Sequence, residues 1–164
     1  MKGRRRFLIL PVTTVLIIVA LHLYLLDGLV GWTLATFYQD DTVYAQQYTD
    51  HRFRRLTTGV DEGAVLGLLG PPLGEVWAFE RHGDLLRIHV GQSGRVESVI
   101  GPRRASYERE LLGSDREAML RDLGQPYWKS WIYTKSANDS SYRIRVVHFR
   151  EGRVARVIHE YYLD

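Results

Sequence analysis

The chain has 164 residues, a formal net charge of +3, 45% hydrophobic residues and no cysteine. This length accommodates one domain of ordinary size, or a smaller domain with an appendage. The composition is too apolar and aromatic for an intrinsically disordered chain. Without cysteine there is no disulfide framework, iron–sulfur cluster, thiol nucleophile or cysteine-based zinc site.

The positive charge is concentrated at the N-terminus. Lys2, Arg4, Arg5 and Arg6 are four of the 22 basic residues, and residues 1–26 contain no acidic residue. The rest of the chain has 18 basic and 19 acidic residues, a net charge of −1. A domain with this charge is a poor match for phosphate backbones, so we expect no nucleic-acid partner.

A run of twenty uncharged residues follows, from Phe7 to Leu26. As a helix it spans about 30 Å, the thickness of a bilayer's hydrocarbon core. The alternative to a membrane span is a cleaved signal peptide. The run is longer than the apolar region of such a peptide, and no Ala-x-Ala cleavage site follows it. We therefore expect an uncleaved transmembrane helix over residues 7–26 behind a cytoplasmic basic tail, residues 1–6. The predicted localisation is the bacterial inner (cytoplasmic) membrane, single-pass, with the C-terminal domain in the periplasm.

His22 is an ionisable residue inside this predicted span, and such residues are functional candidates. The segment from Val19 to Leu26, with Trp32 after it, is similar to the single spans of bacterial light-harvesting antenna polypeptides. In that family the histidine ligates bacteriochlorophyll, so the resemblance implies a pigment contact at His22. The alternative is a neutral histidine at the membrane interface. No other cofactor is expected.

Residues 27–50 are predicted to form a juxtamembrane aromatic helix. The apolar residues that recur at helical spacing are Leu34, Phe37, Tyr38, Tyr44, Ala45 and Tyr48. Trp32 and Tyr38 lie where aromatic residues usually anchor a span. The stripe either packs on its own domain or docks on a partner or the membrane surface. The candidate partner-binding residues here are Trp32, Phe37, Tyr38 and Tyr44.

The most informative feature is an internal repeat at an offset of 54 residues, which becomes 58 after an insertion in the second copy. The matching pairs are Phe53 and Tyr107, Arg55 and Arg109, Gly59 and Gly113, Asp61 and Asp115, Ala64 and Ala118, Leu66 and Leu120, Leu69 and Leu123, Gly70 and Gly124, Pro72 and Pro126, Trp77 and Trp131, and Phe79 and Tyr133. We therefore expect two tandem α/β units, residues 51–102 and 103–164.

Each unit is predicted to contain two helices followed by three antiparallel strands. The second helix is expected to be capped by Asp61 in the first unit and by Ser114 or Asp115 in the second, and stopped by a Gly-x-Pro sequence. The strands are expected around Trp77 and Trp131, at 85–90 and 142–149, and at 96–100 and 154–162. The predicted fold class is α+β: a single N-terminal transmembrane helix followed by two tandem helix–helix–antiparallel β units.

The pattern Gly-x-(Asp/Thr)-x-x-x-(Val/Leu)-x-x-x-Leu-Gly-x-Pro, followed by an aromatic-rich strand and a hairpin, resembles the SmpA/OmlA (BamE-like) family of envelope proteins. The β-lactamase-inhibitor-protein-like fold is similar. The residues that carry the resemblance are Gly59, Asp61, Leu69, Gly70, Pro72 and Trp77, then Gly113, Asp115, Leu123, Gly124, Pro126, Trp131 and Tyr133. It covers residues 53–162 and implies a non-enzymatic protein that binds or scaffolds other proteins.

Catalytic and metal-binding motifs are missing from the sequence. No two of the six histidines have the i, i+4 spacing of a helical zinc site. No serine lies in a Gly-x-Ser-x-Gly nucleophile elbow. We therefore expect neither an enzyme nor a metal site.

The second unit carries aromatic residues that the first unit lacks: Tyr127, Trp128, Tyr161 and Tyr162. They form either a docking surface or a packing surface for the juxtamembrane helix. The expected function is a membrane-anchored periplasmic protein–protein interaction module, an accessory subunit that stabilises a larger membrane complex. Its expected partners are the lipid bilayer and other membrane-complex proteins. The alternatives are a photosynthetic or respiratory subunit that uses His22, and an assembly factor for outer-membrane proteins.

Overall fold

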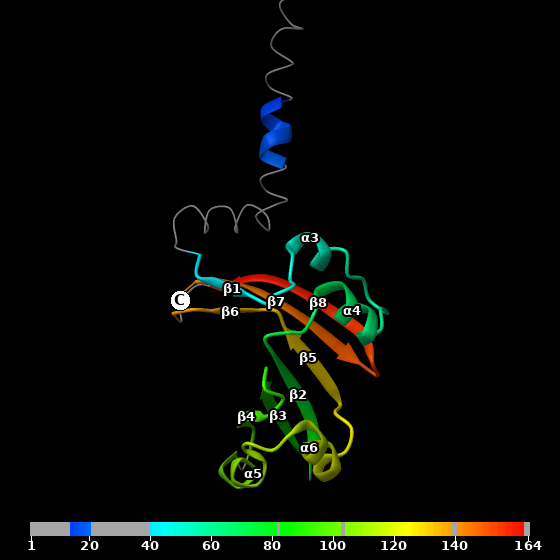
Figure 1. The fold of residues 1–164 in the computed structure, drawn as a ribbon, viewed down its shortest axis with the longest axis vertical. Coiled ribbons are helices and arrows are strands. Elements are labelled where there is room, and N and C mark those ends of the chain that lie inside the picture. Colours follow the sequence, from blue (N-terminus) through cyan, green and yellow to red (C-terminus); the bar gives the residue numbers. More distant parts are fainter. Residues whose placement is uncertain (1–13, 21–39, 82, 103, 139–140, 163–164) are drawn as a thin grey trace, which may run out of the picture.

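The computed structural model describes residues 14–20, 40–81, 83–102, 104–138 and 141–162. In chain order the elements are β1 (Thr42–Tyr44), α3 (Asp50–Phe53), α4 (Glu62–Leu69), β2 (Gly74–Arg81), β3 (Asp84–Gly91), β4 (Val96–Ile100), α5 (Arg104–Leu111), α6 (Arg116–Leu123), β5 (Trp128–Ile132), β6 (Thr134–Ser136), β7 (Tyr142–Arg150) and β8 (Arg153–Tyr162). A six-stranded antiparallel sheet has the order β4-β3-β2-β5-β7-β8, and β1 pairs with β6 in a second sheet (Figure 1).

The predicted fold class is wrong. The structure is mainly β-sheet, whereas we expected tandem helix–helix–β units behind a transmembrane helix. At the centre β2 pairs with β5, with Trp77 opposite Lys129, so the strands of the two expected units form one continuous sheet. This pairing removes two strand edges that separate units would leave open. The strands themselves begin and end close to the expected residues.

The two helices predicted to be capped by aspartate are present, at α4 and α6. The Asp61 carboxylate accepts a hydrogen bond from the Ala64 N–H (2.9 Å), and Asp115 accepts one from Ala118 (2.8 Å). These caps satisfy N–H groups that a helix leaves unpaired in its first turn. Both helices end at a glycine with positive φ, +73° at Gly70 and +79° at Gly124.

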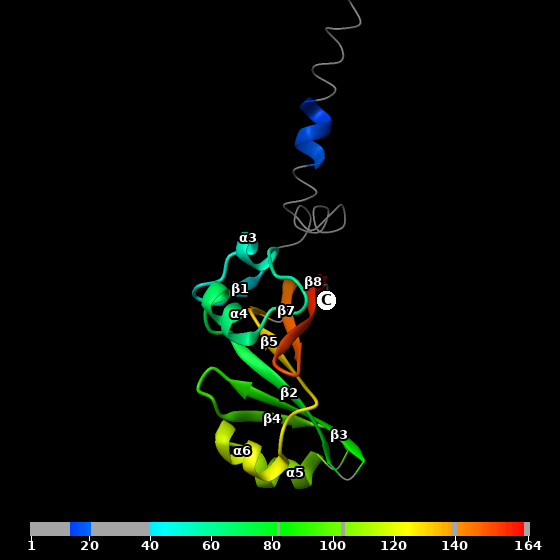
Figure 2. The same cartoon turned by 90° about the vertical axis from the view of Figure 1, so that its right-hand side faces the viewer.

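The helices pack on the strands of the opposite repeat. We call α3 with α4 the first helix pair and α5 with α6 the second; β2, β3 and β4 are the first meander and β5, β7 and β8 the second. Figures 1 and 2 show the first helix pair beside β7 and β8, and the second beside the first meander. The first core contains Phe53, Leu56, Val65 and Leu69 with Trp131, Tyr133, Val147, Phe149 and Val154. The second contains Tyr107, Leu111 and Met119 with Trp77, Phe79, Leu86, Ile88, Val90, Val96 and Val99.

Backbone hydrogen bonds also join each repeat's helical segment to a strand of the other repeat, in the same way in both halves of the molecule. The Gly59 N–H donates to the Val154 carbonyl (2.8 Å), and the Gly113 N–H donates to the Val96 carbonyl (2.9 Å). An isolated β-bridge joins Asp61 to Arg153, and its counterpart joins Asp115 to Arg95. The predicted units 51–102 and 103–164 are therefore not separate packing units, because each core takes residues from both.

Two ion pairs of opposite polarity tie the helices to the central strands. Lys129 on β5 pairs with Glu62 on α4, whereas Glu75 on β2 pairs with Arg116 on α6. Glu62 and Arg116 are equivalent in the repeat, as are Glu75 and Lys129. The Glu75 side chain is only 6% exposed. It also accepts a hydrogen bond from the Trp77 Nε1–H (2.6 Å).

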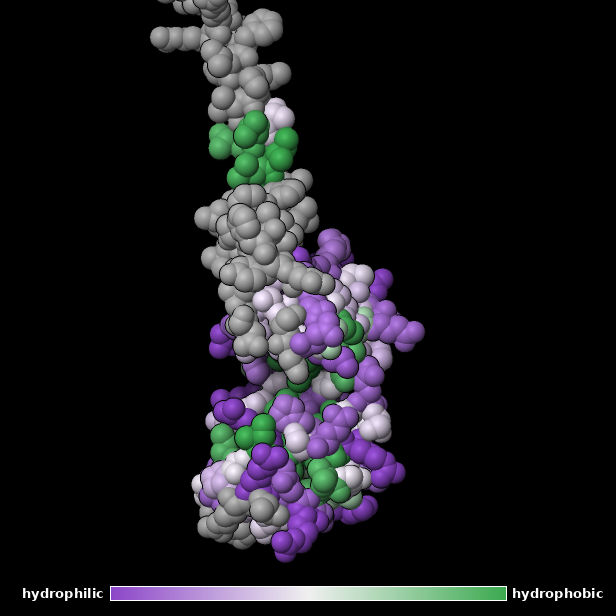
Figure 3. All heavy atoms as spheres, turned by 90° about the vertical axis from the view of Figure 1, so that its left-hand side faces the viewer, coloured by the Kyte–Doolittle hydropathy of each residue, from purple (hydrophilic) through white to green (hydrophobic). Residues whose placement is uncertain are grey.

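Residues 14–20 form a short helix with exposed apolar side chains, seen as the green segment above the mainly hydrophilic surface in Figure 3. Its seven residues rise about 10 Å, a third of a hydrocarbon core. Within the ranges that the structure describes, no helix is long and apolar enough to cross a membrane. This finding contradicts the predicted transmembrane helix over 7–26, the single-pass topology and the inner-membrane localisation. Residues 1–13 and 21–26 lie outside the described residues.

The predicted juxtamembrane helix is also wrong where the structure describes it. Thr42–Tyr44 forms β1, with Val43 opposite Lys135 on β6, and helical structure begins only at Asp50. The β-branched Thr42 and Val43 favour an extended backbone. The Ala45 N–H extends the pairing by donating to the Tyr133 carbonyl (2.9 Å). Residues 27–39 lie outside the described residues.

The crossed ion pairs lead to a stability prediction. The substitution Glu62→Lys replaces the carboxylate beside Lys129 with a second ammonium group. The repulsion between the two should lower the free energy of unfolding by about 1–3 kcal/mol. The control Glu117→Lys makes the same charge change on the exposed surface of α6. Urea unfolding followed by tryptophan fluorescence measures both. Equal effects of the two substitutions would contradict the role of the Glu62–Lys129 pair.

Candidate protein-binding surface

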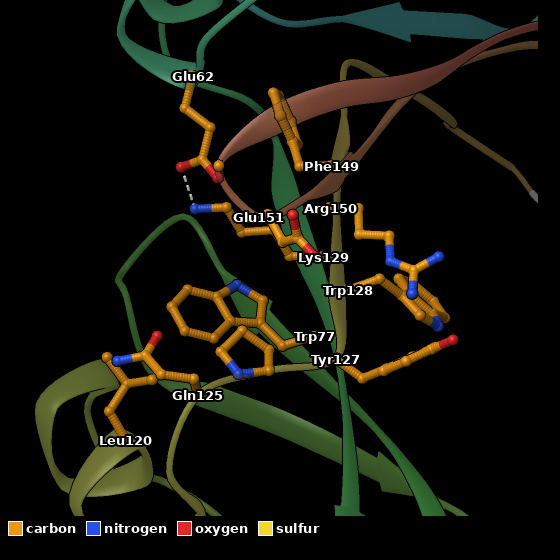
Figure 4. A pocket seen from close by; sticks show the side chains of 12 residues that line it. Glu62, Trp77, Leu120, Gln125, Tyr127, Trp128, Lys129, Phe149, Arg150 and Glu151 are labelled. Carbon is orange, nitrogen blue, oxygen red and sulfur yellow. Dashed lines mark hydrogen bonds and ion pairs between the residues drawn. The ribbon is translucent and has the colours of Figure 1, made fainter. Parts of the chain in front are cut away.

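An open cleft of about 620 Å³ lies where the two cores meet. One wall comes from α6 and the segment that joins it to β5, and the other from α4 and the turn between β7 and β8 (Figure 4). The lining residues are Glu62, Trp77, Leu120, Gln125, Pro126, Tyr127, Trp128, Lys129, Phe149, Arg150, Glu151 and Gly152. The cleft therefore depends on the crossed packing, which brings α4 and the β7–β8 turn to the same place as α6.

Lys129 lies against three aromatic rings at the floor of this cleft. Cross-strand pairing places it between Trp77 on β2 and Phe149 on β7. Its Nζ is 5.5 Å from the Trp77 ring centroid, 5.5 Å from that of Trp131 and 5.9 Å from that of Phe149. The Glu62 carboxylate pairs with the same ammonium (Figure 4). Cation–π contacts of this kind contribute about 0.5–2 kcal/mol each, so Lys129 is held firmly.

Tyr127 and Arg150 form an exposed pair beside the cleft. Tyr127 is 56% exposed, and the Arg150 Cζ lies 5.2 Å from its ring centroid. The Tyr127 N–H donates to the Ala78 carbonyl on β2 (2.7 Å). This hydrogen bond and the preceding Pro126 fix the backbone at Tyr127. The tyrosine side chain is therefore exposed to solvent on a fixed backbone.

Trp128 is half-buried on the face of the sheet opposite the helices α3 to α6. Its ring lies edge-on to His148, with 5.6 Å between the centroids. Burial, assisted by the charge of Arg156, lowers the pKa of His148 and so favours the neutral imidazole. His148 Nδ1 is hydrogen-bonded to the Ser130 hydroxyl. Since Ser130 is only 2% exposed, this serine–histidine pair is closed to a substrate.

The cleft carries two acidic side chains, Glu62 and Glu151, and two basic ones, Lys129 and Arg150. Across the described ranges, no group of three or more histidine, aspartate or glutamate side chains is arranged to hold a metal ion. The aromatic lining and balanced charge suit a polypeptide segment better than a strongly charged small molecule.

The candidate partner-binding residues that the sequence suggested do not form a single surface in the part of the chain that the structure describes. Tyr127 and Trp128 line the cleft. Tyr44, Tyr161 and Tyr162 lie on β1 and at the end of β8, where Tyr44 stacks on Tyr48 (5.3 Å) and Tyr162 contacts Tyr142 (5.6 Å). His22, Trp32, Phe37 and Tyr38 lie outside the described residues.

Sequence reasoning missed three residues that shape the cleft: Glu62, Lys129 and Arg150. Lys129 stands between tryptophans in the sequence Trp-Lys-Ser-Trp, which is an available signal. The set of aromatic rings around Lys129 nevertheless includes Trp77, 52 positions earlier, and depends on the register of β2, β5 and β7. Arg150 and Tyr127 also meet only through the tertiary structure.

An ion-pair network centred on Asp50 stabilises the end of the molecule near Tyr44. Asp50 accepts hydrogen bonds from the Tyr48 hydroxyl and from Arg145 Nε (3.1 Å). The Arg145 side chain is 0% exposed. Burial alone would raise the pKa of Asp50, but the hydrogen bonds from Tyr48 and Arg145 and the charge of Arg145 outweigh it, so the pKa is lowered. The structure thus favours the ionised carboxylate.

No family model, curated protein or solved structure matches the chain. The resemblance to the SmpA/OmlA family stays a prediction.

The network predicts a pH dependence. Because the folded pKa of Asp50 is lowered, its contribution to stability is present above the unfolded value of about 3.9 and is lost as pH falls through the folded pKa. Asp50→Asn should lower the free energy of unfolding at pH 7 by about 2–3 kcal/mol, because Arg145 loses its carboxylate. Urea unfolding from pH 6 to pH 2.5 should show a smaller stability loss on acidification in the variant. Parallel pH profiles would contradict this role of Asp50.

Proposed function

We propose that this chain is a non-enzymatic protein-binding module, an accessory or stabilising subunit of a larger protein complex, and that the cleft receives its partner. The single observation that carries the proposal is Tyr127, which is 56% exposed at the cleft on a fixed backbone. An exposed tyrosine in a rigid setting has little conformational entropy to lose on binding. Tyrosine, tryptophan and arginine are also the residues that dominate binding hot spots.

The neighbouring residues indicate what kind of segment the cleft accepts. Leu120, Pro126 and the edge of Trp77 provide apolar contact area within it. Arg150 lies against the Tyr127 ring and contributes guanidinium donors beside this area. We infer a partner segment with an apolar side chain for the cleft and a carboxylate or backbone carbonyl for Arg150.

Substitutions of Tyr127 and Arg150 should affect partner binding in different ways. Tyr127→Ala removes the exposed anchor and should weaken partner binding about 30-fold or more, as expected for a hot spot. Arg150→Glu reverses the charge at the rim and should mainly slow association, with a strong dependence on salt. Neither side chain belongs to a core, so the free energy of unfolding should change little.

The test is co-purification of the full chain from its host, with the partner identified and its affinity for purified wild type and variants measured by calorimetry. Leu112→Ala is the matched control, because Leu112 is 58% exposed and lies outside the cleft. The proposal requires one partner at fixed stoichiometry, lost with Tyr127→Ala and retained with Leu112→Ala. Binding that survives Tyr127→Ala and Arg150→Glu together would refute the cleft as the binding site.

A further inference from the structure

The outer edge of β8 offers a backbone surface for pairing. β8 is the last strand of the six-stranded sheet. Its first residues are covered, because the Val154 N–H donates to the Val60 carbonyl (2.8 Å) and the Gly59 N–H donates to the Val154 carbonyl (2.8 Å). From residue 155 to residue 162, no strand within the described ranges pairs with this edge. Such an edge is a template for another strand.

The side chains along this edge carry opposite charges on the two sides of Ile158. Arg156 precedes Ile158 by two residues and Glu160 follows it by two. Because side chains alternate in a strand, all three lie on the same face of the sheet, opposite the face on which α3 to α6 pack. An antiparallel copy of the same strand centred on Ile158 would therefore place Arg156 opposite Glu160 twice.

Ile158 also ends an apolar row on that same face. Ile132 on β5 lies opposite Val146 on β7, and Val146 lies opposite Ile158 on β8. All three are half-buried and belong to neither core. The row reaches the sheet edge at Ile158, where a second Ile158 would continue it.

We propose that β8 pairs antiparallel with β8 of a second copy of this chain, with a two-fold axis through Ile158. The two sheets then form one sheet of twelve strands, since each copy contributes six. Arg156 of each copy pairs with Glu160 of the other, and the two apolar rows join across the axis. The surface is isologous, as a closed dimer requires.

Other registers fit the same strand less well. Centring the pair on Glu160 sets two carboxylates against each other. Centring it on His159 sets Ile158 against Glu160. Centring it on Val157 sets Arg156 against Ile158 and brings Glu160 opposite Val154, whose backbone groups already bond to Val60 and Gly59. The charge pattern and the covered start of β8 thus select the register through Ile158.

The test uses charge reversal in the full chain, measured by sedimentation equilibrium in a mild detergent because residues 7–26 are apolar. Wild type should form a dimer. Arg156→Glu and Glu160→Arg should each raise the dimer dissociation constant about tenfold or more, because each places like charges together twice. A mixture of the two variants should restore a one-to-one dimer, since the charges are again complementary. Lys135→Glu is the control, with the same charge change at an exposed site on β6.

A cysteine variant tests the register directly, because the chain has no cysteine of its own. Under mild oxidation Ile158→Cys should give a disulfide-linked dimer, since residues facing each other across the axis lie about 4.5–5.5 Å apart at Cα. Glu160→Cys should not, because its two copies would lie roughly 13 Å apart along the strands. A monomeric wild type, failure of the mixed variants to pair, or preferential crosslinking through residue 160 would each overturn the proposal.

Discussion

Two ion pairs of reversed polarity fix how the helices meet the sheet. Glu62 on α4 contacts Lys129 on β5, and Arg116 on α6 contacts Glu75 on β2. If α4 instead occupied the equivalent position over its own meander, Glu62 would face Glu75, and α6 over its own meander would bring Arg116 to Lys129. Like charges at these positions repel, most strongly at the nearly buried Glu75. The charge pattern therefore favours the crossed packing over the uncrossed one, although the apolar residues of the two repeats are similar.

Crossed packing also creates the cleft that we propose as the binding site. The central pairing of β2 with β5 joins the meanders, and the first helix pair returns to cover β7 and β8. The two cores consequently meet beneath Lys129, and the cleft opens at their junction. Tyr127 lies in the segment that leaves the second helix pair and enters β5. Both cores and the central strands therefore support the proposed binding surface.

Local features were predictable from the sequence, and long-range ones were not. The aspartate caps at Asp61 and Asp115 and the alternating strand residues are encoded within a few positions of each other, and the structure has them there. The mistaken architecture came from assuming that a repeated sequence packs as tandem units. Nothing within one repeat shows that its helices pack on the other repeat's strands, although the sign reversal between Glu62 and Arg116 is visible in the sequence. The contacts of Lys129 with Trp77 and Phe149 depend on strand register, which local sequence patterns do not determine.

The central claim is that each helix pair packs on the meander of the other repeat, and methyl nuclear Overhauser effects in the full chain test it most directly. The account predicts cross-peaks from the Val65 and Leu69 methyl groups to Val147 and Val154, because these side chains share the first core. Cross-peaks from Val65 and Leu69 to Leu86 and Ile88 instead would show that α4 packs on its own meander, and would contradict the account.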